Sequence, residues 1–154
     1  MNYAENLTYT LSASSDSGLP VSFALNPLSQ AAATLSSNVL SISDVGTVTV
    51  DANQSGDAQY NQAPTYKFLV RILPGNTILT NFDIPDKMFD DPDFVITEPV
   101  SNRPGAIRYV SSNPLVADIV GNKIVIKGPG TCIITAIQDG TRKYTQGIAS
   151  SVFT

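Results

Sequence analysis

The chain has 154 residues, 42% of them hydrophobic, and a formal net charge of −4 at pH 7. Its nine Lys and Arg residues are scattered, so we expect no nucleic acid or anionic membrane as a partner, since both require clustered basic side chains. No apolar run approaches the ~20 residues that span a bilayer, and we therefore expect no membrane insertion.

The first half of the chain predicts short β-strands. Apolar and polar residues alternate in residues 7–11, 21–25, 39–42 and 47–52, and clusters of Ser, Asp, Asn, Gly and Pro separate these stretches. This spacing, without any helical period, is typical of a small antiparallel sandwich. In the last stretch Val48, Val50 and Ala52 share one face, which we expect to point into the core.

A Gly-containing turn and a tyrosine follow the stretch 47–52. We expect Gly56 to permit the turn and Tyr60 to fold back and close the end of the sandwich. Lys67 is the only Lys inside an apolar strand, and because Phe68 and Val70 alternate inward, we expect Lys67 to point outward. That orientation argues against an isopeptide cross-link, which would need the Lys buried beside an Asn or Asp and a carboxylate.

Pro74-Gly75 predicts a short linker between two domains, residues 1–73 and 76–154. The second domain begins with a long leading segment, residues 77–93, whereas only six residues precede the equivalent Leu7 in the first. We therefore expect domain 1 to lack its first strand. Either that strand lies upstream of this sequence, or another chain completes the sheet at that edge.

The leading segment contains the strongest candidate for a metal site. Five carboxylates fall within eleven residues: Asp83, Asp86, Asp90, Asp91 and Asp93. Hard cations such as Ca²⁺ bind several oxygen ligands, so these residues predict at most a weak calcium site. The alternative is a solvated, charged edge, which the absence of EF-hand spacing favours.

The second domain repeats the first. "VGTVTVDANQSGDAQYNQ" (45–62) and "PGTCIITAIQDGTRKYTQ" (129–146) match at a constant offset of 84 residues, which indicates two copies of one structural unit. The core set that corresponds to Val48, Val50 and Ala52 is Cys132, Ile134 and Ala136. We expect structural roles for the repeated positions Gly46, Gly56, Tyr60, Gly130, Gly140 and Tyr144 and for the buried Cys132.

No residue constellation indicates catalysis. The chain has no His to activate a Ser, Thr or Cys nucleophile, and we expect no enzyme activity. Glycan-binding faces usually present exposed aromatic rings, and the plausible surface aromatics here are Tyr3 and Tyr66.

The run "SSNPLVADIVGNKIVIKGPGTCIITA" (111–136) resembles the bacterial immunoglobulin-like repeats of the group-2 and "mostly bacterial Ig" types, as found in invasin- and intimin-like adhesins and in phage and large-virus surface proteins. The resemblance covers nearly the whole chain, in both copies. It implies two tandem Ig-like antiparallel β-sandwiches without catalytic residues. It also implies a place outside the cell, on a cell or virion surface.

Three functions stay open at this point. The first is a structural spacer in a surface repeat protein, with neighbouring Ig-like repeats or copies of itself as partners. The second is an adhesin module that binds a host receptor or glycan through its loops. The third is a virion assembly or decoration protein that packs by strand addition at the edge of domain 1.

Overall fold

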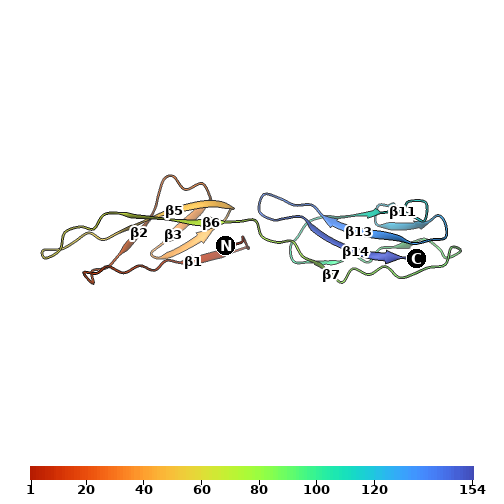
Figure 1. The fold of residues 1–154 in the computed structure, drawn as a ribbon, viewed down its shortest axis with the longest axis horizontal. Coiled ribbons are helices and arrows are strands. Elements are labelled where there is room, and N and C mark those ends of the chain that lie inside the picture. The colour runs from red at the N-terminus through yellow and green to blue at the C-terminus, as the bar shows by residue number, and fades with distance from the viewer. The chain divides into compact units, whose positions relative to one another are not determined.

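The computed structural model describes residues 1–154 and divides into two compact units, Met1–Gly75 and Asn76–Thr154, called domain 1 and domain 2 below (Figure 1). Pro74 and Gly75, the expected linker, fall at the end of the first unit. Both units consist of strands and connecting loops. The structure contains no helix that could span a membrane.

Domain 1 has six strands in two antiparallel sheets. They are β1 (Leu7–Thr10), β2 (Ser22–Leu25), β3 (Ala33–Ser36), β4 (Val39–Ile42), β5 (Gly46–Asn53) and β6 (Tyr66–Ile72). One sheet has the order β1-β4-β3 and the other β2-β5-β6. A constant-type immunoglobulin sandwich has strands A, B, E, D in one sheet and C, F, G in the other. With β1 as strand B, domain 1 has the B-E-D and C-F-G sheets of that fold.

Domain 2 follows the same order with an additional first strand. Its strands are β7 (Leu79–Thr80), β8 (Phe94–Val95), β9 (Val100–Ser101), β10 (Ile107–Ser111), β11 (Ala117–Val120), β12 (Lys123–Ile126), β13 (Cys132–Gln138) and β14 (Gly147–Phe153). The sheets are β11-β12-β8 and β10-β13-β14, and β7 pairs with β9. Since β8 and β9 together correspond to strand B, β7 is strand A. The predicted all-β fold with Ig-like antiparallel sandwiches is confirmed.

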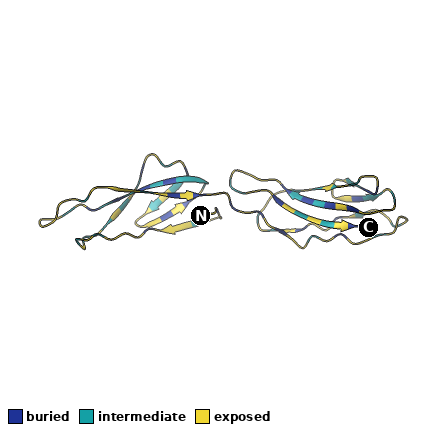
Figure 2. Ribbon diagram, viewed as in Figure 1, coloured by how far each residue is buried: buried dark blue, intermediate teal, exposed yellow.

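Alternation along the strands places the core. Val48 and Val50 are fully buried, as are Ile134 and Ala136, and Cys132 is nearly so. Figure 2 shows buried and half-buried residues alternating along β5, and exposed and half-buried residues alternating between the buried ends of β14. Each fully buried side chain of the size of Val or Ile contributes roughly 1.5–3 kcal/mol, so the predicted inward faces are the main source of stability in both domains.

The N-terminal residues of domain 1 take part in its fold. Asn2 and Leu73 form a parallel bridge, and the amide of Tyr3 donates to the Leu73 carbonyl at 2.7 Å. The Tyr3 side chain is only 5% exposed, so the expectation of a surface aromatic at this position is wrong. The parallel pairing next to β6 draws the chain end over the core and buries the ring.

Candidate functional site

The five carboxylates of the acidic segment do not converge. No group of three or more His, Cys, Asp or Glu side chains in the structure lies close enough to hold a metal ion. Four of the carboxylates bind protein groups instead. Asp83 accepts from Ser151 Oγ, Asp86 from the Thr154 amide, Asp91 from the Met88 amide, and Asp93 from the Ile126 amide. Calcium binding here stays a prediction.

Asp93 fastens this segment to strand β12. Its Oδ2 lies 3.2 Å from Lys123 Nζ, and its Oδ1 accepts from the Ile126 amide. The hydrogen bond from Lys123 is the main reason that the pKa of Asp93 is below its usual value, and the Ile126 amide acts in the same direction. The carboxylate therefore has a structural partner that a cation would have to displace.

The repeated Gly–Tyr motif builds a loop in each domain. In domain 1 the Asp57 amide donates to the Tyr60 carbonyl, and Asp57 Oδ1 accepts from the Tyr60 amide. In domain 2 the Thr141 amide donates to the Tyr144 carbonyl, and Thr141 Oγ1 accepts from the Tyr144 amide. The main chain of each tyrosine thus closes a turn. The side chain of the first residue of the turn, Asp57 or Thr141, accepts a hydrogen bond from the tyrosine amide and caps the turn.

The two tyrosine rings have different surroundings. Tyr60 is 50% exposed, so it does not close the end of the sandwich; that prediction is wrong, because the turn uses its backbone rather than its ring. The Tyr144 ring is half-buried, and the guanidinium of Arg103 lies 5.4 Å from its centroid. Such cation–π contacts contribute about 0.5–1 kcal/mol at exposed sites.

Three of the four repeated glycines have a positive φ, a backbone conformation that favours glycine. Gly46 and Gly130 have φ of 132° and 139°, and Gly56 has φ of 74°. A Cβ on Gly56 would lie 2.5 Å from the Tyr60 carbonyl oxygen. Gly140 is close to the same turn in domain 2, where a Cβ would lie 3.0 Å from the Gln146 amide nitrogen. These residues shape strands and turns.

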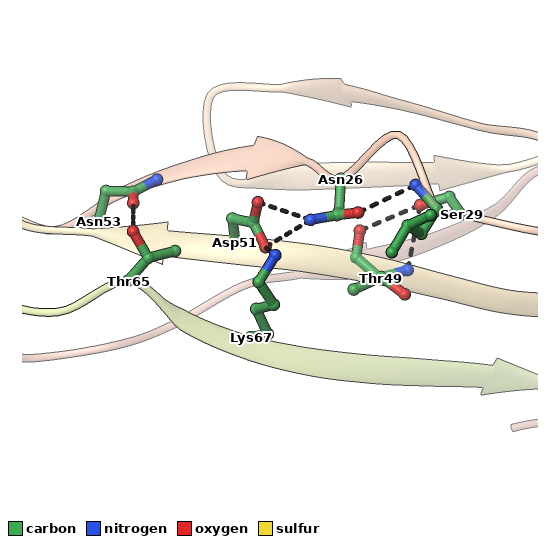
Figure 3. Close-up of polar contacts among 8 residues, drawn as sticks. Asn26, Ser29, Thr49, Asp51, Asn53, Thr65 and Lys67 are labelled. Atoms are coloured by element: carbon green, nitrogen blue, oxygen red, sulfur yellow. Dashed lines mark hydrogen bonds and ion pairs between the residues drawn. The ribbon is translucent and has the colours of Figure 1, made fainter.

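A polar cluster on strand β5 brings together Lys67, Asp51 and Asn26 (Figure 3). Asn26 Nδ2 donates to both Asp51 oxygens at 3.0 and 2.8 Å, and Lys67 Nζ lies 3.6 Å from Asp51 Oδ1. The Lys67 side chain is 57% exposed, so it points outward as expected. Cross-linking would need a buried, desolvated amine, and Lys67 instead forms an ion pair with Asp51 at the surface, while Asn26 is buried.

Three hollows of about 550, 280 and 220 Å³ adjoin residues 11–16 of domain 1, which follow β1. We call residues 11–16 and these hollows the open edge. Ser12, Ala13 and Ser14 make no backbone hydrogen bond. Tyr66 and Phe68 line the smallest hollow, and Tyr66 is 70% exposed, as predicted for a surface aromatic.

Gln54 lies at the open edge with an unused donor. It is 6% exposed, its Oε1 accepts from the Ala63 amide at 3.2 Å, and its buried Nε2 has no partner. Its counterpart Gln138 is 1% exposed and donates from Nε2 to the carbonyls of Arg103 and Gly105. A buried amide without a partner costs about 1–3 kcal/mol.

The sequence contains a signal for the burial of these two amides but not for their different hydrogen bonds. Gln54 continues the inward alternation of Val48, Val50 and Ala52, and it repeats as Gln138, so burial of both amides could be expected. Their hydrogen bonds come from loops that are far away in sequence, and neither alternation nor repetition predicts them.

Comparisons with known proteins give no family. No protein-family model matches the sequence, and no curated protein matches it. Among solved structures, the chain is similar to Drosophila N-cadherin EC1-4, with 12% identity and a TM-score of 0.37 over 94% of this chain and 43% of that one. It is also similar to a SusE-like surface-located polysaccharide-binding protein from the heparin utilisation locus of Bacteroides thetaiotaomicron, with 14% identity, a TM-score of 0.37, and coverage of 99% and 32%. The chain spans less than half the length of either.

Proposed function

We propose that this chain is a non-catalytic module of an extracellular or virion-surface repeat protein, where it holds a spacing or displays a neighbouring element. The observation that carries the proposal is the use of the repeated residues. Gly56, Tyr60 and Tyr144 build turns, and Cys132 packs in a core. A module whose recurrent residues all maintain the sandwich is suited to mechanical and geometric work.

The polar groups that resemble sites support the same role. The Asn26–Asp51–Lys67 cluster and the Asp93–Lys123 pair join neighbouring elements of their own domains. Neither lies beside a nucleophile with an activating base, which covalent catalysis would require. We therefore propose protein partners, namely neighbouring Ig-like repeats, for this module.

A binding survey with the purified chain tests the spacer role against the adhesin role. We expect no saturable binding to a glycan array or to host cells, because the repeated residues serve the sandwich. The surface to watch is the hollow lined by Tyr9, Tyr66 and Phe68, where Tyr66 is 70% exposed. Saturable binding that Tyr66→Ala removes, while Tyr60→Ala in the neighbouring loop leaves it unchanged, would replace the spacer role with adhesion.

Assembly by strand addition at domain 1 is a second candidate function. The open edge favours it, because Ser12, Ala13 and Ser14 make no backbone hydrogen bond, whereas Val100 and Ser101 of domain 2 pair with β7.

A further inference from the structure

The leading segment of domain 2 shows what covers the corresponding edge in that domain. In segment 77–86, β7 pairs antiparallel with β9, and Leu79 and Ile84 are 9% and 3% exposed. The Ile84 amide donates to Ser151 Oγ on β14 at 2.9 Å, and Phe82 stacks on Tyr109 with ring centroids 6.0 Å apart. The segment therefore closes the space between the two sheets with strand pairing and apolar side chains.

One hydrogen bond that occurs in both domains shows which residue of domain 2 corresponds to Met1. The Lys87 amide donates to the Thr154 carbonyl at 3.0 Å, and the Met1 ammonium donates to the Arg71 carbonyl at 2.8 Å. Arg71 and Thr154 correspond, because each is the next residue after the matched pairs Val48–Val70 and Cys132–Phe153. Met1 therefore takes the place of Lys87, and no residue of this sequence takes the place of segment 77–86 in domain 1.

The open edge has the features expected of an unfilled strand position. Ala13 and Ser14 make no backbone hydrogen bond, whereas β9, which lies as far before Gly105 as these two residues lie before Gly18, pairs with β7. Gln54 lines the hollow of about 280 Å³ and has a buried, unpartnered Nε2. In domain 2 Ser101, which pairs with Leu79, donates to Gln138 Oε1, so strand pairing and satisfaction of the glutamine occur together there.

The side chains of β6 beneath the open edge differ from those at the matching positions of β14. This difference determines the size of the side chains that a bound strand can carry. Tyr66 and Phe68 in β6 take the places of Ala149 and Ser151 in β14. Tyr66, Phe68 and Val70 share the inward face of β6, yet the Tyr66 ring is 70% exposed because no strand covers it. Phe68 meets Phe23 edge-on with centroids 6.4 Å apart, which fills part of the space that Phe82 occupies in domain 2. A strand that fits must therefore carry smaller side chains than Phe82 and Ile84.

We propose that domain 1 binds an extended polypeptide strand from outside residues 1–154, paired antiparallel along residues 12–14. Its main chain bonds to Ser12, Ala13 and Ser14, and its small apolar side chains cover Tyr66 and Phe68. Binding orders the loop after residue 14 against Gln54, whose Nε2 then gains a carbonyl partner. A second copy of this chain is a poor donor, because the apolar side chains of Leu79 and Ile84 in its own segment 77–86 are buried in its domain 2.

This inference rests on the second candidate function, assembly. The spacer role does not require the open edge to bind anything. Two synthetic peptides test it with the full chain: residues 77–86 as they stand, and the same peptide with Phe82→Ala and Ile84→Ala. NMR then follows the side-chain amide of Gln54 and the backbone amides of Ser12, Ala13 and Ser14. We expect the small peptide to shift the Gln54 resonance and to raise exchange protection of the three amides at least about tenfold, with the unmodified peptide weaker.

Two chain variants and one internal control sharpen the test. The Gln138 side-chain amide already has its partners, so its resonance should not move. Ala13→Pro removes an amide that makes no hydrogen bond in the free chain, and it should abolish binding. Tyr66→Ala with Phe68→Ser restores the domain 2 floor, and this variant should reverse the preference and bind the unmodified peptide better.

Three results would overturn the inference. One is the absence of any Gln54 shift with either peptide, and another is unchanged binding by both variants. The third is a Gln54 shift that grows with protein concentration without peptide and accompanies a dimer in sedimentation, since the occupant would then be a second copy. None of these results bears on the glycan and cell survey, which tests the spacer role separately.

Discussion

At the scale of single residues, the turn glycines of domain 1 allow two effects to be separated. Gly18 and Gly56 have nearly the same φ, 73° and 74°, but a Cβ on Gly18 meets nothing within 4 Å, whereas one on Gly56 meets the Tyr60 carbonyl at 2.5 Å. Gly18→Ala should cost about 1–2 kcal/mol for the left-handed backbone alone. Gly56→Ala should cost more than about 3 kcal/mol, because the turn must also move. Urea unfolding of the two variants measures the difference, and equal costs would show that the turn yields freely.

The Asp93–Lys123 pair predicts a pH-dependent contribution to stability. Because the pKa of Asp93 is lowered in the folded chain, its contribution is present above the usual value of 3.8 and is lost as the pH falls through the lowered value. Asp93→Asn should therefore lower Tm at neutral pH by a small amount, and the difference from the parent chain should vanish in strong acid. Asp90→Asn is the control, since Asp90 makes no hydrogen bond or ion pair. An equal fall in both variants would point to net charge instead of the pair.

At the scale of strands, β13 offers a test of face assignment with adjacent residues. Ile134 is fully buried in the core of domain 2, and Ile133 is 46% exposed on the opposite face. Ile134→Ala should destabilise domain 2 by about 2–5 kcal/mol through lost burial and a residual cavity. Ile133→Ala should cost about 1 kcal/mol or less, which reflects strand propensity. Thermal unfolding of both variants checks the ratio, and similar costs would contradict the inward register.

The strands also show why part of the structure could be predicted from sequence. Val48, Val50 and Ala52 were correctly assigned to the core because alternation is a local property of one strand. Tyr3 and Tyr60 were assigned wrongly because their burial depends on partners elsewhere. The ring of Tyr3 is buried by pairing beside Leu73, and the turn at Tyr60 needs only its main chain.

At the open edge, too, the features with a local cause could be predicted from sequence, and those that depend on distant contacts could not. The short start of domain 1 is visible in the comparison of the two copies, and a first strand supplied from outside residues 1–73 stays a prediction from it. The unsatisfied Gln54 could not be predicted, because it depends on how residues 11–16 lie relative to β5 when no strand A holds them. The alternation of apolar and polar residues predicts which face of a strand is buried, but it does not predict contacts between segments that are distant in sequence.

At the scale of the whole chain, the two domains should differ in stability. Domain 1 has hollows and an unpartnered amide at the place where domain 2 is closed by segment 77–86, so it lacks buried area and strand pairing that domain 2 has. We expect domain 1 to unfold at a lower urea concentration, with two separate transitions, because each domain has its own sheets and core.

The single cysteine makes this order of unfolding measurable. Cys132 is a free thiol, 3% exposed in domain 2, and its labelling by a thiol reagent in rising urea reports that domain alone. The amides of β5 in domain 1 should lose exchange protection before Cys132 becomes reactive. Ile134→Ala should move the labelling midpoint to lower urea and leave the loss of β5 protection unchanged. Simultaneous loss of both signals in the parent chain, or a shift of both in the variant, would mean that the two domains unfold as one unit.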